Sequence, residues 1–544
     1  MSTQMGASLA SNHEVSLVNA GVALVFCLLA ALTISSCKKT AKPEACAQFH
    51  QRSTLRVAIP VLPLHLCELA KSTYWIRQLT LNLVLEPLVR ENAKTGRIEP
   101  ALAERYAIDT EKKTLTFYLR RGVTFHDGHA LTADDVIFTL DTLMSSTFVN
   151  SAKRSDFDFV ARWQKVDAHT VRIVLKSLNA FALLSFTDLQ IYPRHRFFGR
   201  NFSATCVAER LIGSGPFRVT RRDSQRIELT RYIGYWGRKP GFAKLVFQKA
   251  APEKLLLLLR RHEVDLVPEL PADSVAAFRR DGSLERDYVI FQHPGNAYGM
   301  LGFNLRQARF QKPAVRRAFA RLIDLERIRT TLYRGRAHWA IGPFHPLSSA
   351  TPKLRPFSHD TKRGLELLTK AGWVDRDHDG VLDVDGKAAR LRLLFRAESK
   401  EHRRLATVIR DQLRRYRIDV QLEPLAWGPL LKRVAKGDFD LFLFRWGPIP
   451  YHYDPHPFFH SKGSMNWIGY RDDASDRWIV EAQRTRDAAK RQALYRKLAT
   501  KLFRDQVVQF HFFADALLVG HRCLVGVFPS ALGPQFDRYA PRGK

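Results

Sequence analysis

The chain has 544 residues, of which 45% are hydrophobic, and 86 Lys and Arg against 53 Asp and Glu give it a formal net charge of +33. This composition excludes a disordered or fibrous protein, because there is enough apolar material for packed cores. The length predicts about three or four domain-sized units. The basic excess favours anionic partners such as nucleic acid, phospholipid or acidic solutes, with a solvated cationic surface as the alternative.

A single long apolar run lies near the start of the chain, from Ala20 to Ile34. It is shorter than the roughly 20 residues of a membrane span but suits the core of a secretory signal. The small residues and Cys37 that follow resemble a bacterial lipobox, although residues 1–19 contain no Lys or Arg. We therefore expect a signal peptide over 1–36 with lipidation of the Cys37 thiol, or else an uncleaved anchor. Residues 37–53 are polar and predict a tether.

Cleavage before Cys37 would leave Cys46, Cys67, Cys206 and Cys523 in the mature chain. Four cysteines allow three pairings, and the sequence does not choose among them. Cys46 and Cys67 are near enough in sequence to close a short loop in an oxidising compartment. Buried free thiols are the alternative. The absence of Cys-x-x-Cys from the sequence excludes thiol-redox and zinc-ribbon sites.

The apolar pattern predicts a mixed α/β chain. Residues 54–60 alternate as in a strand, and near-helical spacing predicts a helix over 75–84. Residues 114–119 predict a strand, followed by a turn at 127–128. Thr132 is a suitable N-cap for a helix with acidic residues in its first turn. Further strands are predicted at 170–175, 217–219, 226–231 and 244–248.

Short motifs follow one another along the chain in a definite order. They are Leu85-Glu86-Pro87-Leu88-Val89, Ile98-Glu99-Pro100-Ala101-Leu102-Ala103, residues 115–128 and 131–136, Gly213-Ser214-Gly215-Pro216-Phe217, Tyr235-Trp236, Glu263-Val264-Asp265, Phe303-Asn304, and residues 315–324, 367–373 and 379–383. Together they resemble the family-5 extracellular solute-binding proteins, which serve the peptide and nickel ABC importers. The resemblance covers about residues 54–515.

This resemblance implies an α/β, two-lobed periplasmic-binding-protein fold of type II, in the large peptide-binding class. The first lobe would be discontinuous, with residues 54–295, including an extra subdomain at about 85–210, and a return over 509–544. Residues 296–508 would form the second lobe. Such lobes close by hinge bending and bury a ligand in the cleft between them.

The same resemblance implies a set of ligand-binding residues after position 426. Tryptophans that match Trp427 and Trp446 stand beside the solute in the family, so both would form pocket walls and Gly447 would allow a close backbone approach. Trp467 and Tyr470 follow the same loop and would extend the wall. Core packing is the alternative for all four aromatic side chains.

The loop after Trp446 departs from the family pattern. Peptide-binding members usually place an Asp three residues after this Trp, where it pairs with the α-amino group of the peptide, and this chain has Ile449 there. The change removes a charge-assisted bond to free N-termini. Asp454 is a candidate substitute. Arg445 is a candidate partner for an acidic or carboxylate-bearing ligand, or else a solvated residue at the end of a strand.

Histidines recur every four residues at His452, His456 and His460. Pro455 and Pro457 prevent a regular helix there, so the spacing does not align three imidazoles on one face. We expect these histidines to line a loop, with a metal or metal chelate as the alternative ligand.

Two Asp-Gly segments also contain potential metal ligands. Residues 375–380 resemble the start of an EF-hand loop, but Gly386 stands where a bidentate Glu is needed. A turn between a helix and a hairpin is the preferred interpretation, and weak calcium binding is the alternative. Residues 126–129 contain two histidines and an Asp, and a turn explains them better than a metal site.

The chain contains no Gly-x-Ser-x-Gly elbow, phosphate-binding loop with Lys, or His-Glu-x-x-His helix. The sequence therefore predicts a protein that is not an enzyme and has no cofactor and no metal. The leading hypothesis is a monomeric, lipid-anchored periplasmic protein that delivers a peptide or peptide-like solute to an inner-membrane ABC permease. An envelope sensor or interaction protein and a binder of a nickel chelate are the alternatives. Export argues against nucleic acid as a partner.

Overall fold

The computed structural model describes residues 46, 49–70, 73–145, 153–154, 156–176, 181–384, 386–447, 449, 453–485, 487–528, 530 and 532–542. By its internal contacts the chain divides into residues 1–49 and residues 50–544. The predicted signal peptide, Cys37 and most of the predicted tether lie outside the described residues. None of the described helices is long and apolar enough to cross a membrane.

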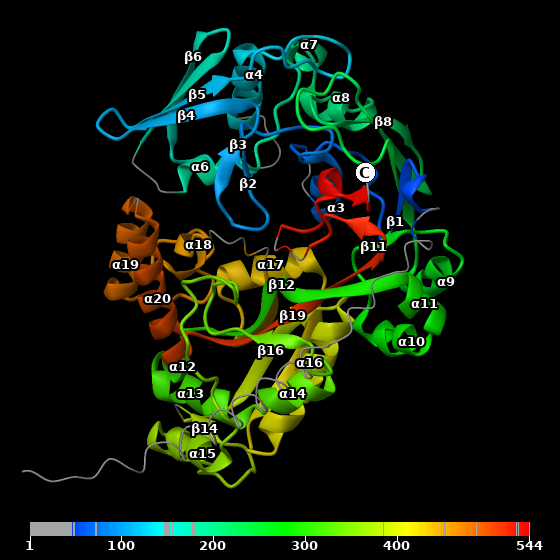
Figure 1. Cartoon of the computed structure of the whole chain (residues 1–544). Coiled ribbons are helices and arrows are strands. Elements are labelled where there is room, and N and C mark those ends of the chain that lie inside the picture. Colours follow the sequence, from blue (N-terminus) through cyan, green and yellow to red (C-terminus); the bar gives the residue numbers. More distant parts are fainter. Residues whose placement is uncertain are drawn as a thin grey trace, which may run out of the picture. The chain divides into compact units, whose positions relative to one another are not determined.

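Eleven strands of residues 50–544 form one large sheet (Figure 1). Its order is β17 (Asp419–Leu425), β16 (Arg390–Arg396), β18 (Leu441–Trp446), β12 (Tyr288–Phe303), β19 (Val508–His521), β11 (Leu266–Val267), β1 (Thr54–Ile59), β10 (Lys244–Lys249), β9 (Arg226–Arg231) and β8 (Phe217–Arg222), with β13 (Ala337–Trp339) paired to β19. The antiparallel pair β12 and β19, of 16 and 14 residues, connects the two ends of this sheet. Their register shifts between Pro294 and Tyr298, where the pairing is interrupted.

Parallel pairing occurs at both ends of the sheet. Strand β1 pairs in parallel with β10 and β11, and β16 pairs in parallel with β17 and β18. The first four residues of β18 are all buried, as expected for a strand that is covered on both faces. The parallel strands β10, β1 and β11 therefore finish together at one end of the sheet, and β17, β16 and β18 finish together at the other.

A separate four-stranded antiparallel sheet follows the order β4 (Ala103–Asp109), β5 (Thr114–Leu119), β7 (Thr170–Leu175) and β6 (Val160–Asp167). It packs against α4 (Ala133–Met144). Thr132 caps this helix in a capping box with Asp135, as the sequence predicts. The strands predicted at 54–60, 114–119, 170–175, 217–219, 226–231 and 244–248 are all confirmed within a few residues.

The predicted helix over 75–84 is shorter in the structure. Helix α3 spans Tyr74–Thr80 and ends because Leu81 adopts an extended backbone conformation, with φ −65° and ψ 124°. Asn82, at φ 62°, then turns the chain further away from the helix axis. Within the described residues, the other α-helices are α6 (Ala182–Ser185), α7 (Arg194–Phe197), α8 (Phe202–Ala208), α9 (Leu255–Arg260), α10 (Val275–Arg280), α11 (Gly282–Asp287), α12 (Ala308–Gln311), α13 (Pro313–Leu322), α14 (Leu325–Thr331), α15 (Thr361–Lys370), α16 (Lys400–Arg414), α17 (Trp427–Lys436), α18 (His456–Phe459), α19 (Asp473–Arg484) and α20 (Ala488–Arg504). Short strand pairs are β2 (Val89–Glu91) with β3 (Ile98–Pro100), β14 (Asp383–Val384) with β15 (Lys387–Ala388), and β20 (Leu524–Val525) with β21 (Ala540–Pro541).

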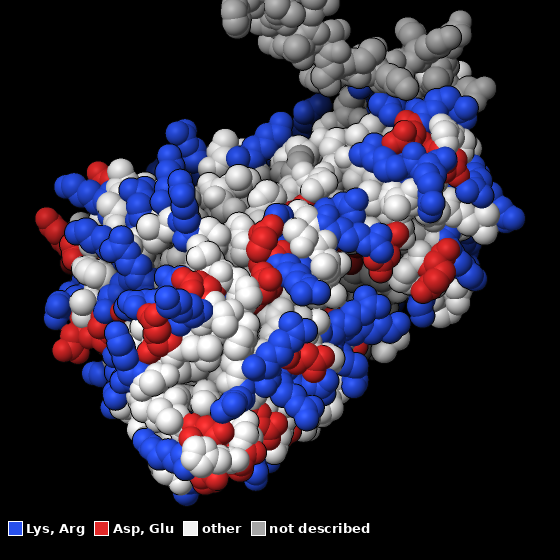
Figure 2. Space-filling model, turned by 90° about the horizontal axis from the view of Figure 1, so that it is seen from below, with Lys and Arg blue, Asp and Glu red and all other residues white. Residues whose placement is uncertain are grey.

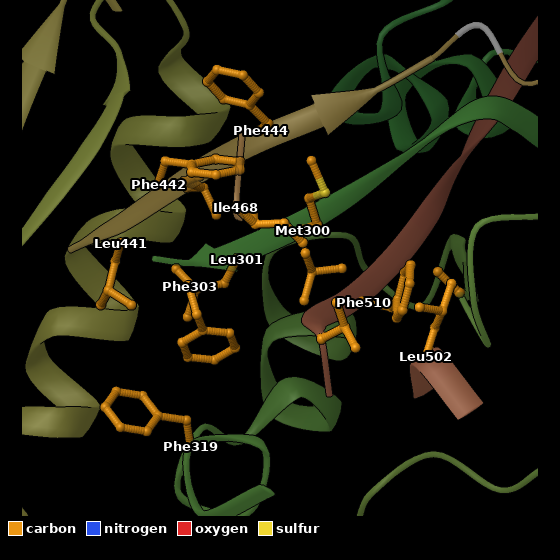
Figure 3. Close-up of a cluster of buried hydrophobic side chains, with 14 of the residues drawn as sticks. Met300, Leu301, Phe303, Phe319, Leu441, Phe442, Phe444, Ile468, Leu502 and Phe510 are labelled. Atoms are coloured by element: carbon orange, nitrogen blue, oxygen red, sulfur yellow. The ribbon is translucent and has the colours of Figure 1, made fainter. Parts of the chain in front are cut away.

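The largest core cluster lies around β12, β18 and β19 (Figure 3). Met300 and Phe303 of β12 contribute to it together with Phe442 of β18 and Phe510 of β19, and Phe319 of α13 packs on Phe303 with ring centroids 5.6 Å apart. This apolar packing fixes β18, whose last residues carry the predicted ligand-binding side chains.

Glu86 joins three of the motifs that sequence analysis identified separately. Its buried carboxylate accepts hydrogen bonds from Ser214 Oγ at 3.0 Å, Tyr235 Oη at 2.9 Å and Trp236 Nε1 at 3.0 Å. All three donors are uncharged, so they satisfy the carboxylate without forming an ion pair. Glu86 therefore links three separate motifs of the fold through hydrogen bonds.

A disulfide joins Cys67 and Cys206, whose Cα atoms are 5.5 Å apart. Cys46 and Cys523 are also disulfide-bonded. The predicted disulfide between Cys46 and Cys67 is therefore wrong, and so is the alternative of buried free thiols. Cys67 is fully buried against α8, which contributes Cys206, and sequence proximity did not reveal this partner.

Lys and Arg side chains are spread over the face shown in Figure 2, with Asp and Glu side chains between them. Elsewhere in the chain, basic side chains also form partly exposed ion pairs, for example Arg392 with Asp438 and Arg433 with Asp438. On this face the basic excess matches a solvated surface rather than one continuous anion-binding patch.

Candidate functional site

The carboxyl ends of β16, β17 and β18 bring together several of the predicted site residues. In open α/β sheets, ligands bind outside the carboxyl ends of parallel strands. Arg396 ends β16, Trp427 follows β17 by two residues, and Arg445 and Trp446 end β18. The Arg396 guanidinium lies 5.6 Å from the centre of the Trp427 ring. This edge therefore combines cationic and aromatic groups.

The carboxyl ends of β10, β1 and β11 form a recess of about 240 Å³. Pro60 and Ala250 line it directly after β1 and β10, and Glu269 lines it after β11. The parallel strands at this other end of the sheet thus also finish at a concave surface.

Glu269 connects the two strand edges electrostatically. The surrounding protein raises its pKa by desolvation, and Arg445 of β18 opposes this increase. Tyr74 at the start of α3 is 40% exposed, yet desolvation and the nearby Glu269 raise its pKa. Tyr74 and Arg445 therefore both lie near enough to Glu269, which lines the recess, for their charges to interact.

Arg445 also meets a second carboxylate. Its Nη1 lies 3.8 Å from Oε2 of Glu401, in the first turn of α16, and the hydroxyl of Tyr333 donates to Oε1 of Glu401 at 2.6 Å. The Arg445 side chain remains 43% exposed. Glu401 and Tyr333 were missed in sequence analysis, because they come from distant segments without a local motif.

Three of the predicted tryptophans form one row through a phenylalanine. Trp427 packs on Phe444 with ring centroids 5.6 Å apart, Phe444 on Trp467 at 5.8 Å, and Trp467 on Trp446 at 5.6 Å. Trp427 is 45% exposed, whereas Trp446 and Trp467 are half-buried. Trp427 therefore has free surface for a solute, and the others brace the row.

Trp446 and Gly447 are fixed by the protein itself. Trp446 Nε1 donates to the Tyr453 hydroxyl at 2.9 Å, and its ring packs on Phe458 at 4.6 Å. A Cβ atom at Gly447 would lie 2.5 Å from Cβ of Ala297, so only glycine fits beside this crossing segment. The close approach made by Gly447 in this structure is to the chain's own backbone, and an approach to a solute stays a prediction.

Tyr470 and Asp454 have partners within the chain. Tyr470 is buried, and its hydroxyl lies 2.9 Å from Oγ of Ser475. Asp454 accepts hydrogen bonds from Gln483 Nε2 at 2.8 Å and from the His456 backbone N–H at 3.0 Å, and burial raises the pKa of Asp454. Their predicted ligand contacts stay predictions, and neither offers a free polar group in this conformation.

Ile449 stands at the position where the resemblance to peptide-binding proteins predicts an Asp. It is fully buried, and its backbone N–H donates to the carbonyl oxygen of Asn296 at 2.6 Å. The position is thus part of the core, and an isoleucine side chain cannot pair with an ammonium group.

The three-histidine segment is partly helical, contrary to the loop that the two prolines predict. Helix α18 begins at His456 after Pro455, and Pro457 occupies the first turn, where its missing N–H costs nothing. The His456 and His460 rings stack with centroids 4.3 Å apart. His452 lies outside the described residues.

The Asp-rich segment forms the predicted turn before the β14–β15 hairpin. Carboxylate oxygens of Asp375, Asp377 and Asp383 lie within 4.8 Å of one another. Asp375 pairs with Arg417 at 3.2 Å, and Asp383 accepts from the Arg376 backbone N–H at 2.7 Å. Asp375 and Asp383 thus each have a partner, while Oδ1 of Asp375 is buried without a hydrogen bond among the described residues.

The family model described as bacterial extracellular solute-binding proteins, family 5 (middle), matches residues 97–469. The chain belongs to this family. The predicted family and fold class are confirmed: the chain has the two-lobed α/β fold of this family, with a discontinuous first lobe and a hinge cleft. The family is extracytoplasmic. The exact lobe boundaries stay a prediction.

Individual relatives share about a quarter of their residues with this chain. Oligopeptide-binding protein AppA of Bacillus subtilis is 26% identical over 416 residues, covering 73% of this chain and 75% of the relative. The nickel-binding periplasmic protein of Escherichia coli is 25% identical, over 83% of this chain and 87% of the relative. The structure of B. subtilis AppA in complex with a nonapeptide superposes with a TM-score of 0.73 at 22% identity, covering 90% of this chain and 99% of that one. These relatives are binding proteins rather than enzymes.

Proposed function

We propose that this protein captures a peptide or peptide-like solute between its lobes and delivers it to an ABC permease, without catalysing a reaction. The proposal depends on one observation: the carboxyl ends of two sets of parallel strands both present side chains that suit a solute. The carboxyl ends of β16, β17 and β18 present Trp427 and Arg445, and the β10–β1–β11 edge presents Glu269, on which Arg445 acts. The printed names of the relatives, among them oligopeptide- and dipeptide-binding proteins, support a peptide as the solute.

In this proposal Trp427 and Trp446 form the apolar wall, with Trp467 and Tyr470 behind them. Arg445 binds a carboxylate of the solute, and Glu401 and Glu269 hold the guanidinium in place until the solute arrives. Because Arg445 is already beside Glu401, the solute carboxylate competes for a cation that is positioned in advance.

The proposed binding site does not require a free N-terminus on its solute, as peptide-binding sites usually do. Ile449 replaces the carboxylate that selects a free N-terminus, and Asp454 already accepts two hydrogen bonds. The proposal therefore includes solutes whose amino end is blocked or linked to another group.

We also propose that the mature protein is a monomer held at the outer face of the cell membrane by lipid on Cys37. The small residues before Cys37, directly after the apolar run, support this attachment.

A thermal-shift panel tests the proposed solute class. The chain is unfolded, freed of small molecules, refolded and mixed with pools of short free peptides, the same peptides with acetylated N-termini, and a nickel–histidine complex. Ligand at a hundred times its Kd is expected to add about 2.7 kcal/mol to the free energy of unfolding, and both peptide pools should raise Tm.

The arms of this panel separate the alternatives. A Tm increase with nickel–histidine alone would favour the metal-chelate alternative, which the nickel-binding relative motivates. An increase with free but not acetylated peptides would contradict the inference drawn from Ile449. No increase in any arm would contradict solute binding and would favour the envelope-sensor alternative.

A further inference from the structure

Asp127, His129 and His195 bring three potential metal ligands together, away from the strand edges described above. One donor atom from each residue lies within 4.8 Å of the others. Oδ1 of Asp127 lies 3.3 Å from His129 Nδ1, and Oδ2 lies 2.8 Å from His195 Nε2. The two imidazole rings are nearly parallel at 21°, with centroids 4.0 Å apart.

The turn that carries Asp127 and His129 is fixed by its neighbours. His126 is held by the backbone, since its Nε2 lies 2.9 Å from the carbonyl oxygen of Gly215 and its Nδ1 accepts from the Gly213 N–H at 3.2 Å. The N–H of Phe125 donates to the carbonyl oxygen of His129 at 2.8 Å and closes the turn. His126 therefore acts as a structural residue, and its two ring nitrogens are both occupied by backbone groups.

His195 is positioned independently, by the packing of α7 beside α4 (Figure 1). The Arg194 backbone N–H donates to Oδ1 of Asp135 at 2.8 Å, and Asp135 belongs to the capping box of α4. The His195 ring also packs on Phe125, with centroids 5.9 Å apart. The two halves of the cluster thus come from separate parts of the fold and meet where His195 packs on Phe125.

The chemistry of the three side chains suits a borderline transition-metal cation. Two imidazole nitrogens and one carboxylate oxygen are ligands that Zn²⁺ accepts, with water in the remaining position. Partial burial acts to raise the pKa of Asp127, but hydrogen bonds from His195 and from the His129 backbone lower it overall. Among the described residues, neither imidazole makes a side-chain hydrogen bond or ion pair outside this group.

The cluster is also accessible to a cation from solution. The side chains of Asp127 and His195 are 25% and 28% exposed, and that of His129 is 62% exposed. Sequence analysis preferred a turn to a metal site at residues 126–129, and it did not identify the third ligand, which α7 contributes.

We propose that Asp127, His129 and His195 form a surface site for a divalent transition-metal cation of the zinc type, separate from the solute cleft. The turn supplies two ligands and α7 supplies the third, and water completes the coordination.

Titration of the purified full chain with Zn²⁺, in competition with a fluorescent chelator, tests this site. We expect one Zn²⁺ per chain, and the variants His129→Ala, His195→Ala and Asp127→Asn should each weaken its binding by about tenfold or more. His129→Ala is the safest variant for folding, because this side chain is the most exposed of the three.

His456→Ala provides the matched control, because His456 stacks on His460 in a second histidine pair whose neighbour Asp454 is already hydrogen-bonded. This control should leave Zn²⁺ affinity unchanged. The proposal is overturned if the wild-type chain binds no Zn²⁺, if the three cluster variants bind it as tightly as wild type, or if only His456→Ala loses it. Melting temperatures measured in chelator confirm that each variant is folded.

Discussion

Replacing Glu86 by alanine is expected to lower the free energy of unfolding by about 3 kcal/mol or more. The variant would leave Ser214 Oγ, Tyr235 Oη and Trp236 Nε1 without their shared acceptor in a buried site. Ser214 is buried and Tyr235 and Trp236 are half-buried, and a buried donor without a partner costs about 1–3 kcal/mol. Urea unfolding followed by tryptophan fluorescence measures the loss.

Glu253→Ala is the matched control for this prediction, because Glu253 is exposed and lies in a surface turn. A surface substitution of this kind is expected to change stability by less than about 0.5 kcal/mol. If Glu86→Ala and Glu253→Ala unfolded at the same urea concentration, the role of Glu86 as the common acceptor of three motifs would be wrong.

The conservative variant Glu86→Gln adds a pH readout to the same prediction. Burial raises the pKa of Glu86 to about 7, against the hydrogen bonds from Trp236, Tyr235 and Ser214 that lower it. A carboxyl with a raised native pKa contributes stability that is complete below its ordinary pKa and is lost as the pH rises through the native value. When the pH rises from 5 to 7, the free energy of unfolding of the wild type should therefore fall by about 2 kcal/mol more than that of Glu86→Gln.

Replacing Trp427 by alanine is expected to weaken solute binding by about 2 kcal/mol, or roughly thirtyfold. Trp427 is the exposed end of the tryptophan row, so its ring is the aromatic surface that a solute can cover. Protein stability should change little, because almost half of this side chain is already in water. Calorimetric titration of the refolded chain with the peptide pool measures the affinity.

Trp163→Ala is the control, because Trp163 is a partly exposed tryptophan on β6, in the separate four-stranded sheet. Its Nε1 donates to Oδ1 of Asp141, so the substitution also removes an aromatic ring and a hydrogen bond. Equal affinities for wild type, Trp427→Ala and Trp163→Ala would show that the tryptophan row does not line the solute site.

Local chemistry was sufficient to predict much of the fold. Alternation predicted β1, and Thr132 predicted the start of α4, because a strand and an N-cap depend on residues close in sequence. The ordered motifs identified the family. The reason for these motifs was not visible, because Glu86 meets Ser214 and Trp236 only after more than a hundred residues of intervening chain have folded.

The candidate site was predictable only in part, for the same reason. Trp427 and Trp446 were found because their surroundings resemble a known pattern. Phe444, which joins Trp427 to Trp467, looked like any buried strand residue. Glu401, Tyr333 and Glu269 reach Arg445 from separate elements, so no spacing in the sequence could reveal them.

Gly447 shows how a correct local observation can have a different physical cause. The sequence predicts a close backbone approach at this glycine, and the structure has one, to Ala297 in the segment that interrupts the β12–β19 pairing. The sequence does not reveal whether a glycine is needed for contact with another chain segment or with a ligand. Only the neighbouring atoms distinguish the two cases.

Mass spectrometry of small molecules released from the natively purified protein tests solute binding most directly. On denaturation, the wild-type chain should release peptides or peptide-like compounds in near-stoichiometric amounts, and Trp427→Ala should release much less. Release of no such compound from wild type, together with no Tm increase when the refolded chain meets the peptide pools, would contradict the proposed function.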